Sequence, residues 1–195
     1  QLRQLNQRGL TIEGDNLIWT PSQSRMVINQ RPKANDGKAQ IRSRELVFQQ
    51  DTEVLEFKGP TQLNRVDGTN AASTVVRCGH GTWNLKSGLL QAPGPVQAIR
   101  SDGRTLSASG LDGNTRQGYL DLQQPVTLVL ESDRGRITAG RTRWLFSAEQ
   151  LESDQPIQAE LKNSKVQGRG FKLDQRTGTV IILSLIHISE PTRPS

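Results

Sequence analysis

Residues 137–144 read Ile-Thr-Ala-Gly-Arg-Thr-Arg-Trp, and residues 105–111 read Thr-Leu-Ser-Ala-Ser-Gly-Leu. Apolar and polar side chains mostly alternate in both stretches, which is the period of a β-strand with one buried face. A turn that contains glycine or Asx follows such strands, as in Lys86-Ser-Gly88 and Arg176-Thr-Gly178. Helical periodicity is absent up to residue 182. These patterns predict an all-β protein.

The strand pattern recurs about every 30 residues. In each unit an apolar residue leads and a small residue follows two positions later, and the steps between the leaders are 29, 35, 30, 31 and 29 residues. The leading pairs are Ile12/Gly14, Ile41/Ser43, Val76/Cys78, Leu106/Ala108, Ile137/Ala139 and Val166/Gly168. Five and seven positions after each leader stand the second pairs, which are Leu17/Trp19, Leu46/Phe48, Gly81/Trp83, Leu111/Gly113, Thr142/Trp144 and Phe171/Leu173. This periodicity predicts a repeat architecture, with an insertion of about five residues near residues 71–79.

Prolines and Asp-Gly pairs mark the boundaries of the strands. A proline is expected to open the second strand of a unit, where its missing N–H falls at the end of the ladder. The four prolines are Pro60, Pro95, Pro125 and Pro156. The pairs Asp67-Gly68 and Asp102-Gly103 supply the left-handed geometry that a tight reversal needs. Each unit therefore reads as an antiparallel hairpin.

The small residues that follow the leaders form a series of their own: Gly14, Ser43, Cys78, Ala108, Ala139 and Gly168. Stacked on neighbouring strands, they make a row with little side-chain volume. Such a row indicates either a crease where the sheet folds tightly, or space kept for a ligand. Cys78 is interpreted as a small buried hydrophobe.

Composition favours a thin, elongated β protein over a compact helical one. Hydrophobic residues make up 33% of the chain and aromatic residues 4%. The net charge is +6, but the arginines are scattered, without the basic face and interleaved aromatics of a nucleic-acid-binding module. No run of 18 apolar residues is present, and the single cysteine excludes a disulfide within the chain. Because the chain opens at Gln1 without an initiator Met, we expect a fragment.

The C-terminal run Leu183-Ser-Leu-Ile-His-Ile-Ser-Glu-Pro-Thr-Arg193 resembles the conceptual translation of a transposase-type sequencing-library adapter. We therefore expect residues 1–9 to be an N-terminal fragment end, residues 10–182 to be the β-repeat domain, and residues 183–195 to be a non-native tail. His187 and Glu190 are left out of any candidate site for this reason.

Two stretches carry a family resemblance. Residues 83–103, Trp-Asn-Leu-Lys-Ser-Gly-Leu-Leu-Gln-Ala-Pro-Gly-Pro-Val-Gln-Ala-Ile-Arg-Ser-Asp-Gly, resemble the OstA-like repeat of periplasmic lipopolysaccharide-transport proteins of the LptA and LptC type. Residues 168–180, Gly-Arg-Gly-Phe-Lys-Leu-Asp-Gln-Arg-Thr-Gly-Thr-Val, resemble it as well. The likeness covers residues 10–182 and lies in patterning, not in an invariant motif.

The resemblance implies an elongated antiparallel sheet folded into a V-shaped or jelly-roll form, with an open apolar groove for the acyl chains of lipid A. It implies a periplasmic carrier or bridge component for lipopolysaccharide or another acylated lipid. It also implies partners that share the fold and join edge to edge, and, for the LptC type, an inner-membrane anchor that this chain does not contain. No nucleic acid and no cofactor are implied.

The groove is expected to be lined by the inward-facing apolar series, in which an ordinary core role and a lipid-contacting role remain alternatives for each residue. The series is Leu17, Trp19, Leu46, Phe48, Trp83, Val126, Leu128, Trp144, Ile157 and Phe171.

The residues predict no catalysis. His80, in the predicted insertion, and Cys78 are too few for a zinc site, and neither a Gly-x-Ser-x-Gly elbow nor a phosphate-binding glycine loop is present. Three alternatives to the transport protein remain: a structural or adhesin-like repeat with a packed interior, another lipid-groove protein similar to AsmA or TamB, and a polysaccharide-acting parallel β-helix. The last would require charged clusters that recur on one face, which are absent.

Overall fold

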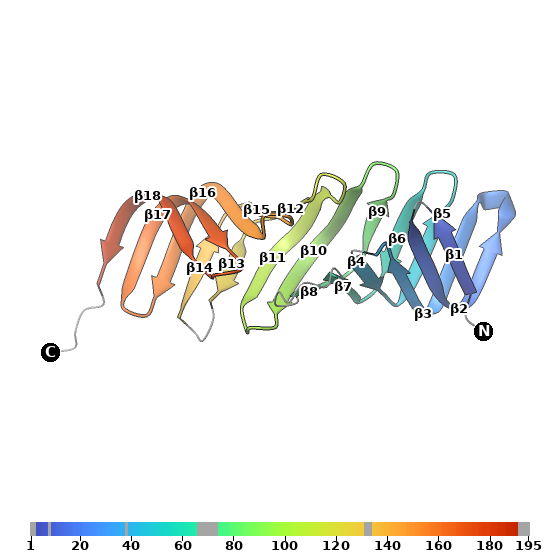
Figure 1. Cartoon of the computed structure of the whole chain (residues 1–195), viewed down its shortest axis with the longest axis horizontal. Helices are drawn as coiled ribbons and strands as arrows, with labels where there is room; N and C mark the ends of the chain where they lie inside the picture. Colours follow the sequence, from blue (N-terminus) through green and yellow to red (C-terminus); the bar gives the residue numbers. More distant parts are fainter. Residues whose placement is uncertain (1–2, 8, 38, 66–73, 131–133, 191–195) are drawn as a thin grey trace.

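The computed structural model describes residues 3–7, 9–37, 39–65, 74–130 and 134–190. These residues form one elongated, twisted sheet of eighteen strands, with a single 3-10 turn, η1 (Pro21–Gln23) (Figure 1). The strands are β1 (Arg3–Gln7), β2 (Leu10–Thr20), β3 (Arg25–Asn35), β4 (Ala39–Arg42), β5 (Glu45–Gln49), β6 (Val54–Lys58), β7 (Thr61–Arg65), β8 (Thr74–Cys78), β9 (Gly81–Asn84), β10 (Leu89–Arg100), β11 (Thr105–Asn114), β12 (Tyr119–Leu122), β13 (Val126–Val129), β14 (Gly135–Ala139), β15 (Thr142–Leu145), β16 (Gln150–Leu161), β17 (Ser164–Asp174) and β18 (Val180–Ser189). The predicted all-β class is confirmed.

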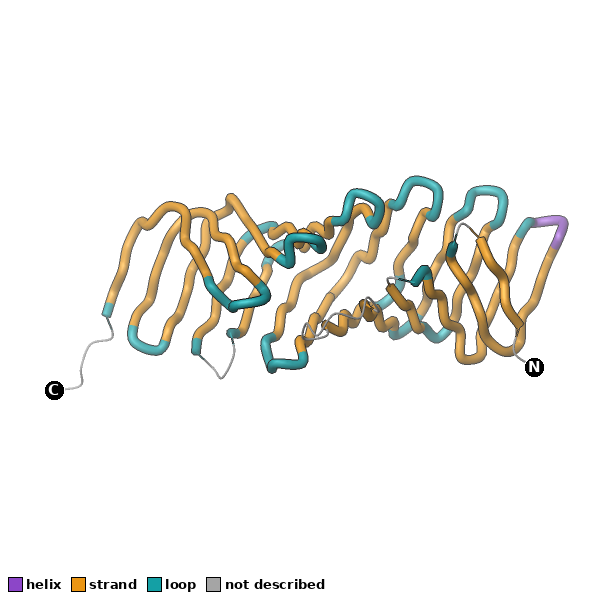
Figure 2. The backbone as a smooth tube through the Cα atoms, viewed as in Figure 1, coloured by secondary structure: helices purple, strands orange, loops and turns teal. Residues whose placement is uncertain are grey.

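The sheet is divided into two layers that share the long strands. One end of β10 pairs with β9 and its other end with β8, and β11, β3 and β16 divide in the same way between two short strands. We call layer A the part that contains β5, β6, β9, β12 and β15, and layer B the part that contains β4, β7, β8, β13 and β14. Figure 2 shows the turns of the two layers along opposite long edges of the molecule. All pairs are antiparallel, as hairpin repeats require.

The six leading residues of the repeat fall in one row across layer B. The register joins, in order, Ile12, Ala34, Ile41, Leu63, Val76, Ala98, Leu106, Leu128, Ile137, Ala159 and Val166. The leaders are 1–7% exposed. Directly paired residues of an antiparallel sheet lie on the same face, so the row forms one apolar wall of the interior. The predicted repeat register is confirmed.

The crease between the layers lies where the long strands change register. The shifts fall between Glu13 and Asp15, between Pro93 and Val96, and between Ser153 and Pro156. A bulge bends the strand that carries it. Each long strand therefore turns from one layer into the other without ending.

This crease corrects the prediction that each of the four prolines opens a strand. Pro60 and Pro125 do precede β7 and β13, but Pro95 and Pro156 lie inside β10 and β16. Pro95 falls within the register shift of β10 and Pro156 directly follows that of β16, and a bulge allows proline there without ending the strand. All four prolines mark the crease.

The series of small residues lies along the same crease. A Cβ atom built on Gly14 would come 2.5 Å from Ile28 Cγ2 and 3.0 Å from the Gln30 carbonyl oxygen. In layer B, Ala139 pairs with Val126 on one side and with Ile157 on the other. At Gly14, close packing at a crease is therefore the reason for the small residue.

Several predicted turns are present. Gly88, Gly103 and Gly178 adopt φ values of +83°, +90° and +72°, which a residue with a side chain rarely adopts. The Asp67-Gly68 turn and residues 71–73 of the predicted insertion lie outside the described residues, whereas residues 74–78 of that insertion form β8. His80 was expected in that insertion, but it is exposed between β8 and β9, at the crease.

The last strand, β18, pairs with β17 but buries little. Ile181, Leu183, Leu185, Ile186 and Ile188 are 55–71% exposed. Within residues 183–189, Ser184, Leu185, His187, Ile188 and Ser189 pair with β17, and the non-native origin of residues 183–195 stays a prediction. The fully buried core ends at β17, and Val180 and Ile182 pack against it half-buried.

Candidate functional site

The interior of layer A contains a second continuous row. Starting from the open edge of β2, the register joins Trp19, Met26, Phe48, Leu55, Trp83, Leu90, Gly113, Leu120, Trp144, Leu151, Leu173 and Val180. We call this the tryptophan row, because all three tryptophans of the chain belong to it. It faces the leader row of layer B, and both contribute to one hydrophobic cluster.

The structure places the ten predicted groove residues on these inward faces. Eight are at most 6% exposed: Leu46, Phe48, Trp83, Val126, Leu128, Trp144, Ile157 and Phe171. Leu17 is partly buried and packs against the same cluster. Nine of the ten are therefore buried or half-buried and are spread along the whole interior, and their contact with lipid stays a prediction.

Trp19 differs from the others in exposure. Its indole belongs to the tryptophan row, yet the residue is 40% exposed. Within the described ranges, β1 pairs only with residues 10–14 of β2, and residues 15–20 pair only with β3. Trp19 is therefore the member of the tryptophan row with the largest exposed fraction.

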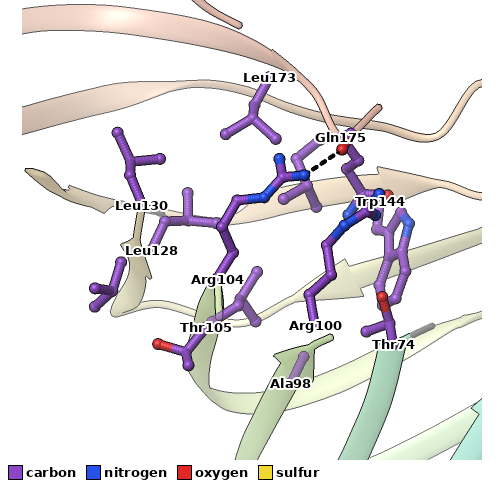
Figure 3. A pocket seen from close by; sticks show the side chains of 13 residues that line it. Thr74, Ala98, Arg100, Arg104, Thr105, Leu128, Leu130, Trp144, Leu173 and Gln175 are labelled. Carbon is purple, nitrogen blue, oxygen red and sulfur yellow. Dashed lines mark hydrogen bonds between the residues drawn. The ribbon is translucent and has the colours of Figure 1, made fainter. Parts of the chain in front are cut away.

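A cavity of about 40 Å³ remains between the layers near β11 and β13 (Figure 3). Leu106, Leu128 and Leu130 line it from layer B, and Trp144, Leu151 and Leu173 from layer A. Pockets that enclose a drug-sized ligand measure about 300–1,000 Å³. The cavity therefore admits only a small group in this conformation, and the rest of the groove at this point is filled by the protein's own side chains.

The two buried tryptophans differ in their hydrogen bonding. The indole N–H of Trp83 donates to Thr115 Oγ1 over 3.1 Å. The buried Nε1 of Trp144 has no hydrogen-bond partner among the described residues. A buried donor without an acceptor is unusual and costs on the order of 1–3 kcal/mol. The N–H of Trp144 is therefore an unsatisfied polar group, among the described residues, in an otherwise apolar lining.

Two arginines lie at the mouth of the cavity, on the turn between β10 and β11. Arg100 Nε and Arg104 Nε each lie 2.9 Å from Asp102 Oδ2. Arg104 Nη2 also donates to the Gln175 carbonyl oxygen over 2.6 Å, and Figure 3 shows this bond as a dashed line. Gln175 follows β17 in layer A, so the bond joins the free edges of the two layers.

This cluster holds Asp102 in its ionised form. Partial burial alone would raise the pKa of Asp102, but the hydrogen bonds and charge of Arg104, together with Arg100, bring that pKa down to about 2. At neutral pH the two guanidinium groups and one carboxylate therefore carry a net charge of +1.

Two further arginines, Arg141 and Arg143, lie away from this cavity. Arg143 Nε donates to Asp121 Oδ1 over 2.8 Å and Arg141 Nη2 donates to Asp121 Oδ2 over 2.6 Å, so these charges neutralise a buried carboxylate. Arg143 also lies 4.1 Å from the centre of the Tyr119 ring. Asp121 thus holds two guanidinium groups, as Asp102 does, but the side chains of Arg141 and Arg143 are 56% and 44% exposed and neither lines the cavity between the layers.

The remaining reactive side chains form no catalytic arrangement in the described part of the chain. Burial raises the pKa of the Cys78 thiol to about 11, so the thiol is protonated and unreactive at neutral pH. Across the described ranges, no cluster of three or more His, Cys, Asp or Glu side chains is arranged to hold a metal ion. Nor does any helix among the described residues have the length and apolarity to cross a membrane.

The sequence patterns do not predict the residues at the mouth of the cavity. They predict a turn at Asp102-Gly103, but they predict neither the ion pairs of Asp102 with Arg100 and Arg104 nor the proximity of this turn to Gln175. Arg104 and Gln175 are 71 positions apart, and no local pattern relates them.

The comparisons with known proteins give little further information. No family model and no curated protein matches the chain. Among solved structures, the chain is similar to LptH, described as the LptA homologous periplasmic component of the lipopolysaccharide transport device of Pseudomonas aeruginosa. The match covers 95% of each chain at 9% sequence identity, with a TM-score of 0.32.

Proposed function

We propose that this chain is a periplasmic, non-enzymatic lipid carrier or bridge component, which holds acyl chains of lipopolysaccharide or a similar lipid between layers A and B. The observation that carries the proposal is the tryptophan row, an apolar stripe that runs from the exposed Trp19 to Val180 and whose buried members form one hydrophobic cluster with the leader row. The resemblance of residues 83–103 and 168–180 to OstA-like repeats supplies the lipid class.

The energetics favour an interior of this kind. Each methylene removed from water contributes about 0.8 kcal/mol, so a twelve-carbon chain gains on the order of 8–10 kcal/mol from leaving water. A surface ion pair contributes roughly 0–1 kcal/mol. Retention of the lipid would therefore come from the apolar rows, and charged groups would mainly orient the headgroup.

Binding requires the two layers to separate, because a cavity of about 40 Å³ cannot hold an acyl chain. Separation exposes apolar side chains, but an inserted chain covers them again, so apolar contacts within the protein are exchanged for apolar contacts with the lipid. The shared crease allows the layers to part at their free edges while the strand ladder stays intact. The lipid then selects the open form by binding it better than the closed one.

The unpaired edges are the second element of the proposal. In the part of the chain that the structure describes, the outer edge of β1, residues 15–20 of β2 and the outer edge of β18 pair with no further strand. Unpaired N–H and C=O groups favour addition of another strand. We therefore propose that proteins with the same fold join here and continue the interior.

The packed interior also favours a second candidate, a structural repeat that binds no lipid. The two are separated by photo-crosslinking residues placed at Trp83 and Leu128, with the outward neighbours Thr82 and Thr127 as matched controls. The carrier predicts lipid adducts at Trp83 and Leu128 only. Adducts at the outward positions alone, or none at all, would favour the structural repeat.

A further inference from the structure

The turn between β10 and β11 combines excess positive charge with an apolar cavity. The side chains of Arg100 and Arg104 are each 12% exposed, and Asp102 is 23% exposed. Asp102 is shared by both guanidinium groups, and no carboxylate is found among the cavity-lining residues. Among the described residues, one positive charge is therefore left without a counterion in a partly desolvated place, where an anion is attracted more strongly than at the open surface.

The hydrogen bond that spans the mouth of the cavity has a weak, uncharged acceptor. Arg104 Nη2 donates to the neutral carbonyl of Gln175. A phosphate or carboxylate oxygen forms a shorter and stronger hydrogen bond with a guanidinium group than a neutral carbonyl does. An anion that reached Arg104 would therefore displace the carbonyl and remove this link between the layers.

Directly below the mouth, the lining is apolar. Leu128, Leu130 and Leu173 lie beside Arg104 in Figure 3. Trp144 lines the same cavity, and its N–H has no acceptor among the described residues. An amphiphile placed here would set its oxyanion on the arginines, its chain against the leucines, and an ester or hydroxyl oxygen within reach of a free donor.

From these observations we propose that Arg100 and Arg104 bind the oxyanion of an anionic amphiphile, a phosphate or carboxylate attached to an acyl chain, and that this oxyanion takes the place of the Gln175 carbonyl on Arg104 so that the layers part at this point. The inference rests on the proposed function and extends it, because it locates the headgroup and couples its binding to opening.

The test compares three ligands by titration calorimetry: dodecyl phosphate below its micelle concentration, dodecanol and inorganic phosphate. With the unaltered chain, dodecyl phosphate is expected to bind more tightly than dodecanol, and inorganic phosphate only weakly. Arg104→Gln is expected to weaken the binding of dodecyl phosphate roughly tenfold and not to weaken that of dodecanol, because only the phosphate loses a charged hydrogen bond. Arg136→Gln, at an exposed arginine of β14, is the matched control and should change neither.

The outcomes separate the two proposals. Equal affinity for dodecyl phosphate and dodecanol, or equal effects of Arg104→Gln and Arg136→Gln, would overturn the oxyanion site while leaving the carrier in place. If inorganic phosphate bound as tightly as dodecyl phosphate, the apolar cavity would contribute nothing to binding and would not be part of the proposed site. Failure of both amphiphiles to bind would contradict the carrier itself.

A second measurement needs no variant. The side-chain Nε–H resonance of Arg104 in the unaltered protein should move on addition of dodecyl phosphate and stay in place with dodecanol. An unmoved resonance at saturating dodecyl phosphate would overturn the oxyanion site, even if Arg104→Gln proved unable to fold.

Discussion

Trp83 and Trp144 lie in one row, and the register joins them through Leu90, Gly113 and Leu120. They are 61 positions apart, which is two repeats. Trp83 satisfies its N–H with Thr115, whereas Trp144 faces a cavity and has no acceptor in the described structure. The same position of the repeat thus serves as ordinary core at one place and as lining of a cavity at another.

Gly81, the first residue of β9, lies at the crease, where close packing requires a glycine. A Cβ atom on Gly81 would lie 2.4 Å from both the Gln91 carbonyl oxygen and Phe57 Cζ. Gly81→Ala is expected to lower the free energy of unfolding by about 1–3 kcal/mol, because backbone and ring must shift. Urea denaturation measures this. Gly79→Ala is the control, since a Cβ there meets nothing within 4 Å, and an equal loss in both variants would contradict the close approach.

Asp102 is expected to make stability depend on acid pH. Its pKa is about 2 in the folded chain, below the ordinary value of 3.8, so its contribution is complete above about pH 4 and is lost as the pH falls towards 2. The free energy of unfolding of the unaltered chain should therefore exceed that of Asp102→Asn above pH 4, and the difference should shrink between pH 4 and pH 2. A difference that is constant over this window would show that Arg100 and Arg104 do not hold the carboxylate ionised.

Cys78 is expected to react slowly. With a pKa of about 11 instead of 9.0, its thiolate fraction at pH 8 is roughly 100-fold smaller than that of an ordinary thiol. The rate of alkylation by iodoacetamide should therefore keep rising beyond pH 9. The variant Cys78→Ser/His80→Cys moves the only cysteine to an exposed position and should react faster at pH 8. Similar rates for the two proteins would refute the burial of Cys78.

The C-terminal run is expected to contribute little to the fold. Leu183, Leu185 and Ile186 are each at least 55% exposed, so a chain that ends at Ile182 loses little buried apolar surface. We expect its melting temperature to stay within a few degrees of that of the full chain, because surface changes seldom exceed about 0.5 kcal/mol. Thermal unfolding followed by circular dichroism measures this. A chain that fails to fold without residues 183–195 would show that the run is part of the domain.

The repeat could be predicted from sequence because its period is local. Ile12, Leu106 and Ile137 alternate with polar neighbours, and alternation with one buried face fixes which side chains point inward. Pro95 and Pro156 were misplaced because a bulge allows a strand to continue through a proline, and a bulge depends on the partner strand as well as on the residue.

The candidate site could be predicted only in part. The inward face of Leu128 and Trp144 follows from alternation, but the width of the space between them depends on how two layers pack. The link from Arg104 to Gln175 depends on the twist of the whole sheet, which no short stretch of sequence encodes.

Entry of acyl chains between the two layers can be followed by fluorescence quenching with a lipid that carries bromine atoms midway along its acyl chain. Three variants are needed, each of which retains one tryptophan and replaces the other two with phenylalanine. We expect quenching of both buried residues, Trp83 and Trp144, relative to the same lipid without bromine. Quenching of the exposed Trp19 alone would contradict it.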